Sequence, residues 1–387
     1  MTIERGKRKL AGLFAEFLES EMSSGVVLFL ATVVAITLAN SPLADAYGRL
    51  WHAEFLGHTL QHWINDGLMA VFFLLIGLEI ERELYVGELT DHKKALLPIV
   101  AAVGGMAVPA VIHFLLNHGT ATAKGAGIPT ATDIAFAIGI LSFLKKRIPS
   151  TLKVFLVALA IIDDLGAIVV IALFYAAGLS IPHLVAALAV FALLLALNRF
   201  GLSRLSIFLP VGLLMWYLML QSGVHATIAG VLLAFAVPFR SGDGASPSYR
   251  LQHFLHKPVG FVIMPLFALA NTGLRLPERW LDSVVTANSL GIMMGLLIGK
   301  PLGIWLFSYL AVRWKLSALP AGVRWRHVVG AGMLGGIGFT MSIFITTLAF
   351  EDDQLLIGSK LSILVASVLA GGTGYLILRN GTGARVR

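Results

Sequence analysis

Two adjacent aspartates, Asp163 and Asp164, lie in the strongly apolar stretch VALAIIDDLGAIVVIALFYAAG, which covers residues 157–178. An aspartate at the centre of a membrane helix costs roughly 2.5 to 3.5 kcal/mol on insertion scales. Neighbouring side chains on a helix point about 100° apart, so one carboxylate can face a site while the other lines its edge or meets an adjacent helix. Burial and a second carboxylate favour the protonated acid, whereas ionised oxygens are hard ligands for small cations. The pair therefore predicts a site that exchanges protons for a metal ion.

Further ionisable residues fall at membrane depth: Asp66, Glu79, Asp133 and Lys300. Such residues usually face a bundle interior or a watery cavity and mark an ion or proton path. A single one is equally well explained by a buried ion pair that fixes helix packing. Together with the aspartate pair, they favour an ion path.

The stretch GIPTATDIAFAIGI predicts an interrupted span, because Pro129 removes a backbone donor and Thr130 and Thr132 can bond to the backbone themselves. An interruption at mid-membrane exposes helix ends with partial charges, positive at the N-terminus and negative at the C-terminus. Asp133 is suited to neutralise an end of the first kind, and Lys300, in LLIGKPLGIW, an end of the second kind.

A second interruption is predicted in GMLGGIGFTMSIF, where Gly335, Gly336 and Gly338 precede Thr340 and Ser342. Close packing of helices through glycine is an alternative explanation of this pattern. Its position favours an interruption, because the two stretches lie in spans four and eleven. Such a pair is expected if spans three to five and ten to twelve are repeats around a transport site at mid-membrane.

The composition predicts that lipid surrounds the chain. Hydrophobic residues make up 57% of the 387 residues and charged residues only 13%, and the mean hydropathy is +0.86. Runs of about 18 to 22 apolar residues are each long enough to cross a bilayer core of about 30 Å. The roughly 10-residue alternating segments of an outer-membrane barrel are missing. Cysteine is also missing, which excludes disulfides and thiolate metal sites. We expect an all-α polytopic membrane protein.

About twelve transmembrane helices are expected in a single domain that covers residues 1–387. The expected spans are near 24–41, 60–80, 95–116, 127–144, 153–176, 183–198, 205–221, 223–237, 258–273, 289–311, 327–349 and 359–378. Inverted repeats are expected over roughly 95–176 and 289–378. Between the first two spans lies an external loop or hairpin, 42–59. The stretch AEFLGHTLQH, residues 53–62, suits either a short hairpin or a surface helix.

The distribution of basic residues orients these spans. Of the 29 Lys and Arg residues, Lys300 lies inside a span, and most of the others fall in alternate loops. The exceptions are Arg49, Lys124, Arg275, Arg279 and Lys360. The positive-inside rule then places both termini in the cytoplasm. The net charge of +8 is explained by this orientation, so no nucleic-acid partner is expected. The charged lead 1–24 and the apolar core 26–39 are long for a signal peptide, so we expect the first span to remain.

A group of titratable residues is predicted at the cytoplasmic mouth. Glu79, Arg82 and Glu83 end the second span at near-helical spacing, and His253 and His256 precede the ninth. Histidine titrates near neutral pH, so a pH-responsive entrance is one interpretation. An interfacial salt-bridge cluster is the other.

Two residues near the opposite side are less specific. His225, in SGVHATIAG, is either bonded to the backbone at a helix start or a titrating sensor. Asp66, close after Trp63, suits a helix cap as well as an ion path.

In several ordered blocks the sequence resembles the NhaA-type sodium/proton antiporters of bacteria over essentially the whole chain. The blocks are WINDGLMAVFFLLIGLEIEREL, PTATDIAFAIGIL, FLVALAIIDDLGAI, SGVHATIAGV, MPLFALANTG, GLLIGKPLGI and GGIGFTMSIF. The resemblance implies exchange of sodium or lithium for protons without a cofactor, with more protons than cations moved per cycle. It also implies two crossing broken helices in spans four and eleven, inverted repeats and residence in the bacterial inner membrane.

The resemblance also implies roles for single residues. Asp163 and Asp164 resemble the cation- and proton-binding pair, Thr132 and Asp133 resemble contributors at the crossing, and Lys300 resembles its basic partner. The mouth group and His225 correspond to a region associated with pH activation. A hairpin within 46–57 would pair two copies into a homodimer.

One departure and two rival functions remain. Gln252 stands where the family commonly has glutamate, which puts that part of the pH response in doubt. An intramembrane aspartyl protease needs two aspartates on two helices that share one water, which adjacent residues do not easily provide. A passive cation channel would use rings of acids or carbonyls from several subunits. A single asymmetric site with a buried lysine favours exchange.

Overall fold

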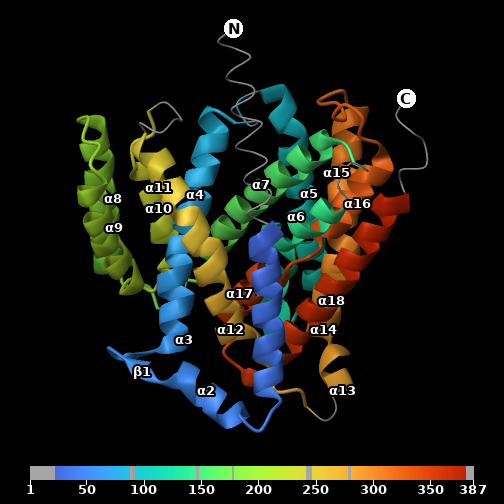
Figure 1. Ribbon diagram of the computed structural model, residues 1–387, viewed down its shortest axis with the longest axis horizontal. Coiled ribbons are helices and arrows are strands. Elements are labelled where there is room, and N and C mark those ends of the chain that lie inside the picture. The colour runs from blue at the N-terminus through green and yellow to red at the C-terminus, as the bar shows by residue number, and fades with distance from the viewer. Residues whose placement is uncertain are drawn as a thin grey trace.

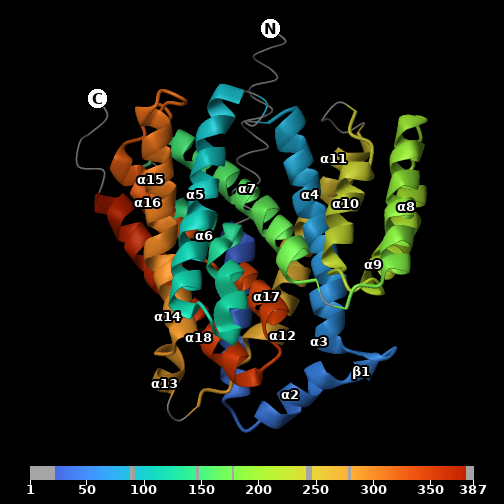
Figure 2. The same ribbon diagram turned by 180° about the vertical axis from the view of Figure 1, so that it is seen from behind.

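The computed structural model describes residues 22–380 apart from 88–89, 91, 145–147, 177, 241–245 and 278–279. Over these ranges the molecule is a bundle of helices with one two-stranded sheet at its end (Figures 1 and 2). Residues 1–21 and 381–387, which include both ends expected in the cytoplasm, lie outside the described residues.

Long apolar helices form most of the bundle, and eight are long and apolar enough to cross a membrane. The unbroken ones are Met22–Ala39, Ala95–Asn117 of α5 (His92–Asn117), α7 (Ser150–Phe174), α8 (Ile181–Arg199) and α18 (Asp353–Asn380). The others contain a π-helical segment: α3–η1–α4 (Leu60–His62, Trp63–Leu68, Met69–Tyr85), α11–η5–α12 (Pro247–Pro258, Val259–Ile263, Met264–Thr272) and α14–η6–α15 (Ala287–Met294, Gly295–Gly299, Lys300–Arg313). The chain is therefore an all-α, multi-pass membrane protein.

The two predicted interruptions are present. The 3-10 helix η3 (Ala121–Thr130) and α6 (Ile134–Phe143) are bent by 41° across residues 131–133, and α16 (Trp325–Gly335) and α17 (Phe339–Ala349) are bent by 47° across 336–338. Pro129 lies inside η3, and glycine occupies two of the three residues of the second break.

The predicted count of twelve spans stays a prediction. If each bent pair is one span, the described residues hold up to ten. The remaining two apolar helices, α9 (Leu205–Leu220) and α10 (Thr227–Ala236), have 16 and 10 residues. At about 1.5 Å per residue, both are shorter than a hydrocarbon core of about 30 Å.

The loop between the first two spans contains a helix and, within the stretch 53–62, the hairpin that was one of the two alternatives for it. Helix α2 (Ala44–His52) is followed by the antiparallel strands β1 (Glu54–Phe55) and β2 (His58–Thr59). The strands begin inside the range 46–57 expected for a hairpin, and the second strand ends two residues beyond it, at Thr59. Positive φ angles at Leu56 (51°) and Gly57 (83°) give the tight turn. We call the end of the molecule with α2, β1 and α13 (Trp280–Val284) the hairpin face (Figure 1).

Close backbone contact brings α15 against α5. A Cβ at Gly104 would lie 2.4 Å from the Gly303 carbonyl oxygen, and a Cβ at Gly303 would lie 2.1 Å from that of Gly104. Small residues permit this approach between membrane helices. The first residue of α15, Lys300, is thereby held inside the bundle with no exposed surface.

Candidate functional site

The two breaks meet in the middle of the bundle. Residues 131–133 connect η3 to α6 without helical structure, and Asp133 donates its backbone N–H to the carbonyl of Ile337 over 2.6 Å. This bond joins the break of span four to the break of span eleven. Four helix ends therefore converge at the crossing, each with unsatisfied backbone groups.

Asp133 caps two helices at once. As the N-cap of α6 it accepts the backbone N–H of Phe136 at Oδ1 over 3.1 Å. Its Oδ2 accepts the backbone N–H and the hydroxyl of Thr340, in the first turn of α17, over 3.2 and 2.5 Å. A single carboxylate thus lies at the positive ends of both half-helices, as its position in the sequence predicted.

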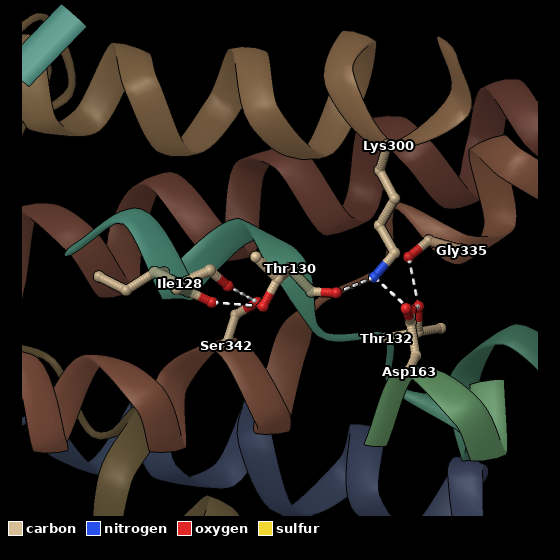
Figure 3. A network of polar contacts seen from close by, with 8 residues as sticks. Ile128, Thr130, Thr132, Asp163, Lys300, Gly335 and Ser342 are labelled. Carbon is tan, nitrogen blue, oxygen red and sulfur yellow. Dashed lines mark hydrogen bonds and ion pairs between the residues drawn. The ribbon is translucent and has the colours of Figure 1, made fainter. Parts of the chain in front are cut away.

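Lys300 lies at the opposite kind of helix end. Its Nζ donates to the carbonyl of Thr130, the last residue of η3, and lies 2.5 Å from Oδ2 of Asp163 (Figure 3). Both side chains of this ion pair are fully buried. The expected neutralisation of a helix C-terminus is present, and the carboxylate that pairs with Lys300 is Asp163.

Thr132 connects the pair to span eleven. Its hydroxyl lies 2.7 Å from Oδ2 of Asp163 and 2.9 Å from the carbonyl of Gly335, the last residue of α16 (Figure 3). The hydroxyl has one proton, so it donates to one of these acceptors at a time. When the hydroxyl donates to Asp163, the Gly335 carbonyl loses this hydrogen bond. When it donates to Gly335, the Asp163 carboxylate loses it.

Each aspartate of the pair keeps an unused oxygen. Oδ1 of Asp163 and Oδ1 of Asp164 are buried and have no hydrogen-bond partner among the described residues. Asp164 lines a cavity of about 50 Å³ together with Thr132, Asp133 and Thr340. Buried polar atoms without partners are costly and rare, and a cavity of this size has room for more than one water-sized particle. The arrangement is suited to a small cation.

The cavity extends from the crossing to the part of the predicted mouth group that lies on α4 and α11. Glu79 and His256 line it, and Nδ1 of His256 lies 3.9 Å from Oε1 of Glu79. The Gln252 side chain contacts the same carboxyl. Arg82 pairs with the adjacent Glu83 over 3.0 Å on α4.

Two predicted pH-response residues lie elsewhere. His253 is on the exposed side of α11 and stacks with Tyr249, so it does not join Glu79 and His256. Position 253 is turned by about 100° from position 252 but only about 60° from position 256, so the packing of α11 and not the spacing leaves His253 exposed. His225 donates from Nε2 over 2.8 Å to the carbonyl of Tyr175, just after α7, which is the backbone contact proposed as one of its two interpretations. Asp66 lies 3.3 Å from His62.

Two functional contacts were missed in the sequence. Thr340 was noted only as a residue after glycines, although a threonine directly after a helix start is a signal for capping contacts. Glu81 was not singled out, yet it is buried and accepts the Ser248 hydroxyl over 2.7 Å, which ties α4 to the first turn of α11. A charged residue near the end of a helix, such as Glu81, does not by itself indicate that its partner is Ser248.

Comparison with known proteins gives one consistent result. The sequence profile of the family described as Na+/H+ antiporter 1 matches residues 15–378. The Na(+)/H(+) antiporter NhaA of Dechloromonas aromatica is 58% identical over 374 residues, which cover 96% of both chains. The Na(+)/H(+) antiporter NhaA 1 of Flavobacterium johnsoniae is 54% identical over 371 residues, 96% of this chain and 97% of its own. The NhaA antiporter of Shewanella frigidimarina is 50% identical over 373 residues, 94% of this chain and 95% of its own.

Proposed function

Because the chain belongs to the Na+/H+ antiporter 1 family and exchanges sodium ions for protons across a membrane, we propose that Asp163 and Asp164 bind the two substrates in turn. The observation that carries this proposal is the buried Oδ1 of each aspartate, without a partner among the described residues, together with the cavity that Asp164 lines at the crossing. A buried carboxylate is tolerated either when it is protonated or when a cation neutralises it. The two states are mutually exclusive at one site.

Exchange follows from this exclusion. When a sodium or lithium ion enters, the aspartates give up their protons and their oxygens become ligands, with the Thr132 oxygen close by. Lys300 competes with the cation for Asp163, because both need the same ionised carboxylate. A site that is loaded by either ion and opened to one side at a time couples the two fluxes without a separate device.

The exchange is proposed to be electrogenic, with more protons than cations moved in each cycle. Two aspartates can release two protons for each monovalent cation that they bind. Loss of a proton from Lys300 when Asp163 leaves it is an alternative source of one of these protons. Either source moves more protons than cations in each cycle.

The path and the orientation are proposed as follows. The cavity that joins Asp164 to Glu79 and His256 is the cytoplasmic passage, and the hairpin face lies outside the cell. The basic residues in alternate loops support this orientation, both termini in the cytoplasm and residence in the bacterial inner membrane. The bent pairs lie in the middle of 95–176 and 289–378, which supports inverted repeats within a single domain. The strands of 54–59 would pair two copies into a homodimer.

Regulation by pH is proposed to begin at the cytoplasmic passage. Glu79 and His256 line the passage, and Arg82 and Glu83 lie in the next turn of α4. Protonation of these groups changes the charge that an entering cation meets. His225 and the exposed His253 do not line this passage, so the proposal gives them no part in the charge that an entering cation meets.

The test is exchange by full-length protein in energised inside-out vesicles that contain a pH-sensitive dye. Sodium added to the wild type should dissipate the proton gradient, and no cation leak should appear without that gradient, which separates exchange from a channel. Asp163→Asn and Asp164→Asn should each abolish the response while the protein stays folded, because the amide keeps the volume but neither titrates nor carries charge. Asp282→Asn, at an exposed position, is the control. Normal sodium-dependent proton movement in either variant would remove that aspartate from the site.

A further inference from the structure

A second buried polar network lies outside the crossing, on the part of α5 near the hairpin face. His113 contacts Asn288 of α14 over 3.1 Å between Nε2 and Oδ1, and Asn288 donates to the hydroxyl of Ser359 in α18 over 2.8 Å. The three side chains are at most 3% exposed. Because the Asn288 amide nitrogen faces Ser359, its oxygen faces the imidazole, so Nε2 of His113 carries the proton. The network thus has one defined direction of donation.

The same histidine supports the outer half of broken span four. A Cβ at Gly125 of η3 would lie 3.0 Å from Cε1 of His113, so this half-helix packs directly on the imidazole. One turn further along α5, the fully buried Asn117 accepts the hydroxyl of Thr122 over 2.7 Å. η3 is therefore fixed on α5 at two points, and it ends at Thr130, whose carbonyl accepts Lys300.

The other side of the imidazole supports the helix that leads to Lys300. A Cβ at Gly291 of α14 would lie 2.8 Å from Cδ2 of His113. Asn117 also donates to the carbonyl of Ala287, at the start of α14, over 3.2 Å. From this fixed point the chain passes through the π-helix η6 to Lys300. π-helical turns are local departures from regular packing and are frequent at functional sites.

These contacts close a ring. The imidazole packs against both Gly125 of η3 and Gly291 of α14, and η3 also touches η6 directly where Gly295 approaches Pro129. η3 carries the Thr130 carbonyl, α14 leads to the Lys300 ammonium, and these two groups meet at the crossing. Between the network and the crossing, α5 contacts η6 through Pro109 and α15 through Gly105. Neither residue has a polar side-chain group that could fix the register of these helices. The spacing set by His113 is thus transmitted to the contact of Lys300.

We propose that His113, Asn117 and Asn288 are positioning residues that set the distance between Lys300 and the Thr130 carbonyl, and through it the affinity of the site for sodium. The proposal rests on the proposed function of Asp163 and Lys300 as the exchange centre. The network touches neither substrate. Its loosening changes how strongly Lys300 competes with sodium for Asp163, while the aspartates themselves stay intact.

The experiment is a sodium titration of proton-gradient dissipation in the same vesicles with the full-length chain. His113→Met keeps the side-chain size and removes the donor, and Asn288→Leu removes the acceptor. Each should shift the half-saturating sodium concentration roughly threefold to tenfold, the size expected for one net hydrogen bond. His113→Gln places an amide donor near the position of Nε2 and should stay within about twofold of the wild type. The double variant should be no worse than the stronger single variant, because both break one contact.

A control and a milder variant keep the outcome decisive. Asn198→Leu removes a hydrogen bond from the side-chain amide of α8 to the carbonyl of Ala236 in α10. This bond is 3.1 Å long and lies outside the ring. It should lower the thermal transition and leave half-saturation unchanged. Ser359→Ala removes only the last acceptor of the network and serves if His113→Met does not fold.

The failures are distinguishable. A wild type without sodium-dependent dissipation overturns the proposed function. A wild type that exchanges, with His113→Met less heat-stable but unchanged in half-saturation, overturns the positioning role alone. An equal shift in His113→Gln and His113→Met also overturns it, because the donor would then be irrelevant.

Discussion

The chain contains two ion pairs of the same chemical kind in opposite surroundings. Lys300 and Asp163 are both fully buried at the crossing, whereas the side chains of Arg275 and Asp45, on the hairpin face, are 62% and 77% exposed. Water screens the exposed pair and solvates either partner alone, so such pairs contribute about 0 to 1 kcal/mol. A buried partner left alone has no such alternative. An ion pair of this kind thus contributes little to the stability of the protein at the surface. At the crossing, by contrast, loss of one partner strongly destabilises the protein.

The largest effect is expected at Lys300. Lys300→Ala leaves the Asp163 carboxylate and the Thr130 carbonyl without their buried partner, a change that costs about 3 to 5 kcal/mol in proteins of known stability. The variant should have a much lower thermal transition in detergent and impaired exchange. In an Asp163→Asn background the same substitution should destabilise less, because no uncompensated charge remains. An ordinary thermal transition in the single variant would argue that Lys300 meets water, and the comparison of the two pairs would then fail.

A smaller effect is expected at Asp133. Its carboxylate caps α6 and α17 together, so Asp133→Ala should lose about 0.5 to 2 kcal/mol for each helix. Asp133→Asn keeps an acceptor oxygen and should lose less in the thermal transition, while the altered charge at the crossing still lowers exchange. Equal thermal transitions for Ala and Asn would show that capping is not what Asp133 contributes. Thr340→Val, which removes one of its donors, is the matched control on α17.

Because the signals are local, the sequence was sufficient to predict most residues that meet at the crossing, though not the contact of Thr340 with Asp133. Each signal is a residue that makes a membrane helix less stable: adjacent aspartates in an apolar run, a proline inside one span and glycines inside another. Such residues are explained by a function or by a break in the helix. The pairing across the break was not readable in the same way. Whether Lys300 meets Asp133 or Asp163 depends on how the half-helices cross, and this is fixed by packing between segments far apart in the chain.

The positions of His253 and of the His113 network also depend on how the helices pack. On α11, helical spacing turns His253 by about 100° from Gln252, so the sequence could have set the histidine apart from that glutamine, although not from His256, three residues further on. The His113 network could not be predicted from spacing, because its members come from α5, α14 and α18 and no local pattern connects them. Long-range polar contacts of this kind become visible only once the helices are packed.

The mouth group lies between the two ion pairs in exposure and should give an intermediate response. Gln252→Glu places a second carboxylate beside Glu79, which favours bound protons nearby. The activity profile should move toward more alkaline pH by about one unit, because both side chains are buried beside the cavity, with maximal rate and sodium requirement kept. The measurement is dye-based exchange from about pH 6 to 9, the range in which histidines and perturbed carboxylates titrate.

The two histidines of α11 provide the control for that prediction. His256→Ala removes a cavity-lining group and should also displace the profile, whereas His253→Ala changes an exposed residue and should not. An unchanged profile in both Gln252→Glu and His256→Ala would leave the buried aspartates as the origin of any pH dependence.

The smallest effect is expected at the exposed pair. The hydrogen bond from Arg275 and its positive charge hold the pKa of Asp45 below its usual value. A carboxyl whose folded pKa is lowered adds stability above its unfolded pKa, and this contribution disappears as the pH falls through the folded pKa. Asp45→Asn should therefore leave the thermal transition almost unchanged at pH 7, with a slight loss that diminishes as the pH falls below the usual aspartate pKa of about 3.9. Raising the ionic strength to about 1 M should remove the same small loss at neutral pH, because exposed charges are screened over about 3 Å there. Thermal transitions of the two proteins at both pH values and both ionic strengths are the measurement, and exchange activity should be equal throughout. A loss at Asp45 as large as that at Lys300 would mean that solvent exposure does not decide the worth of an ion pair in this molecule, and the reason given for a buried pair at the crossing would no longer hold.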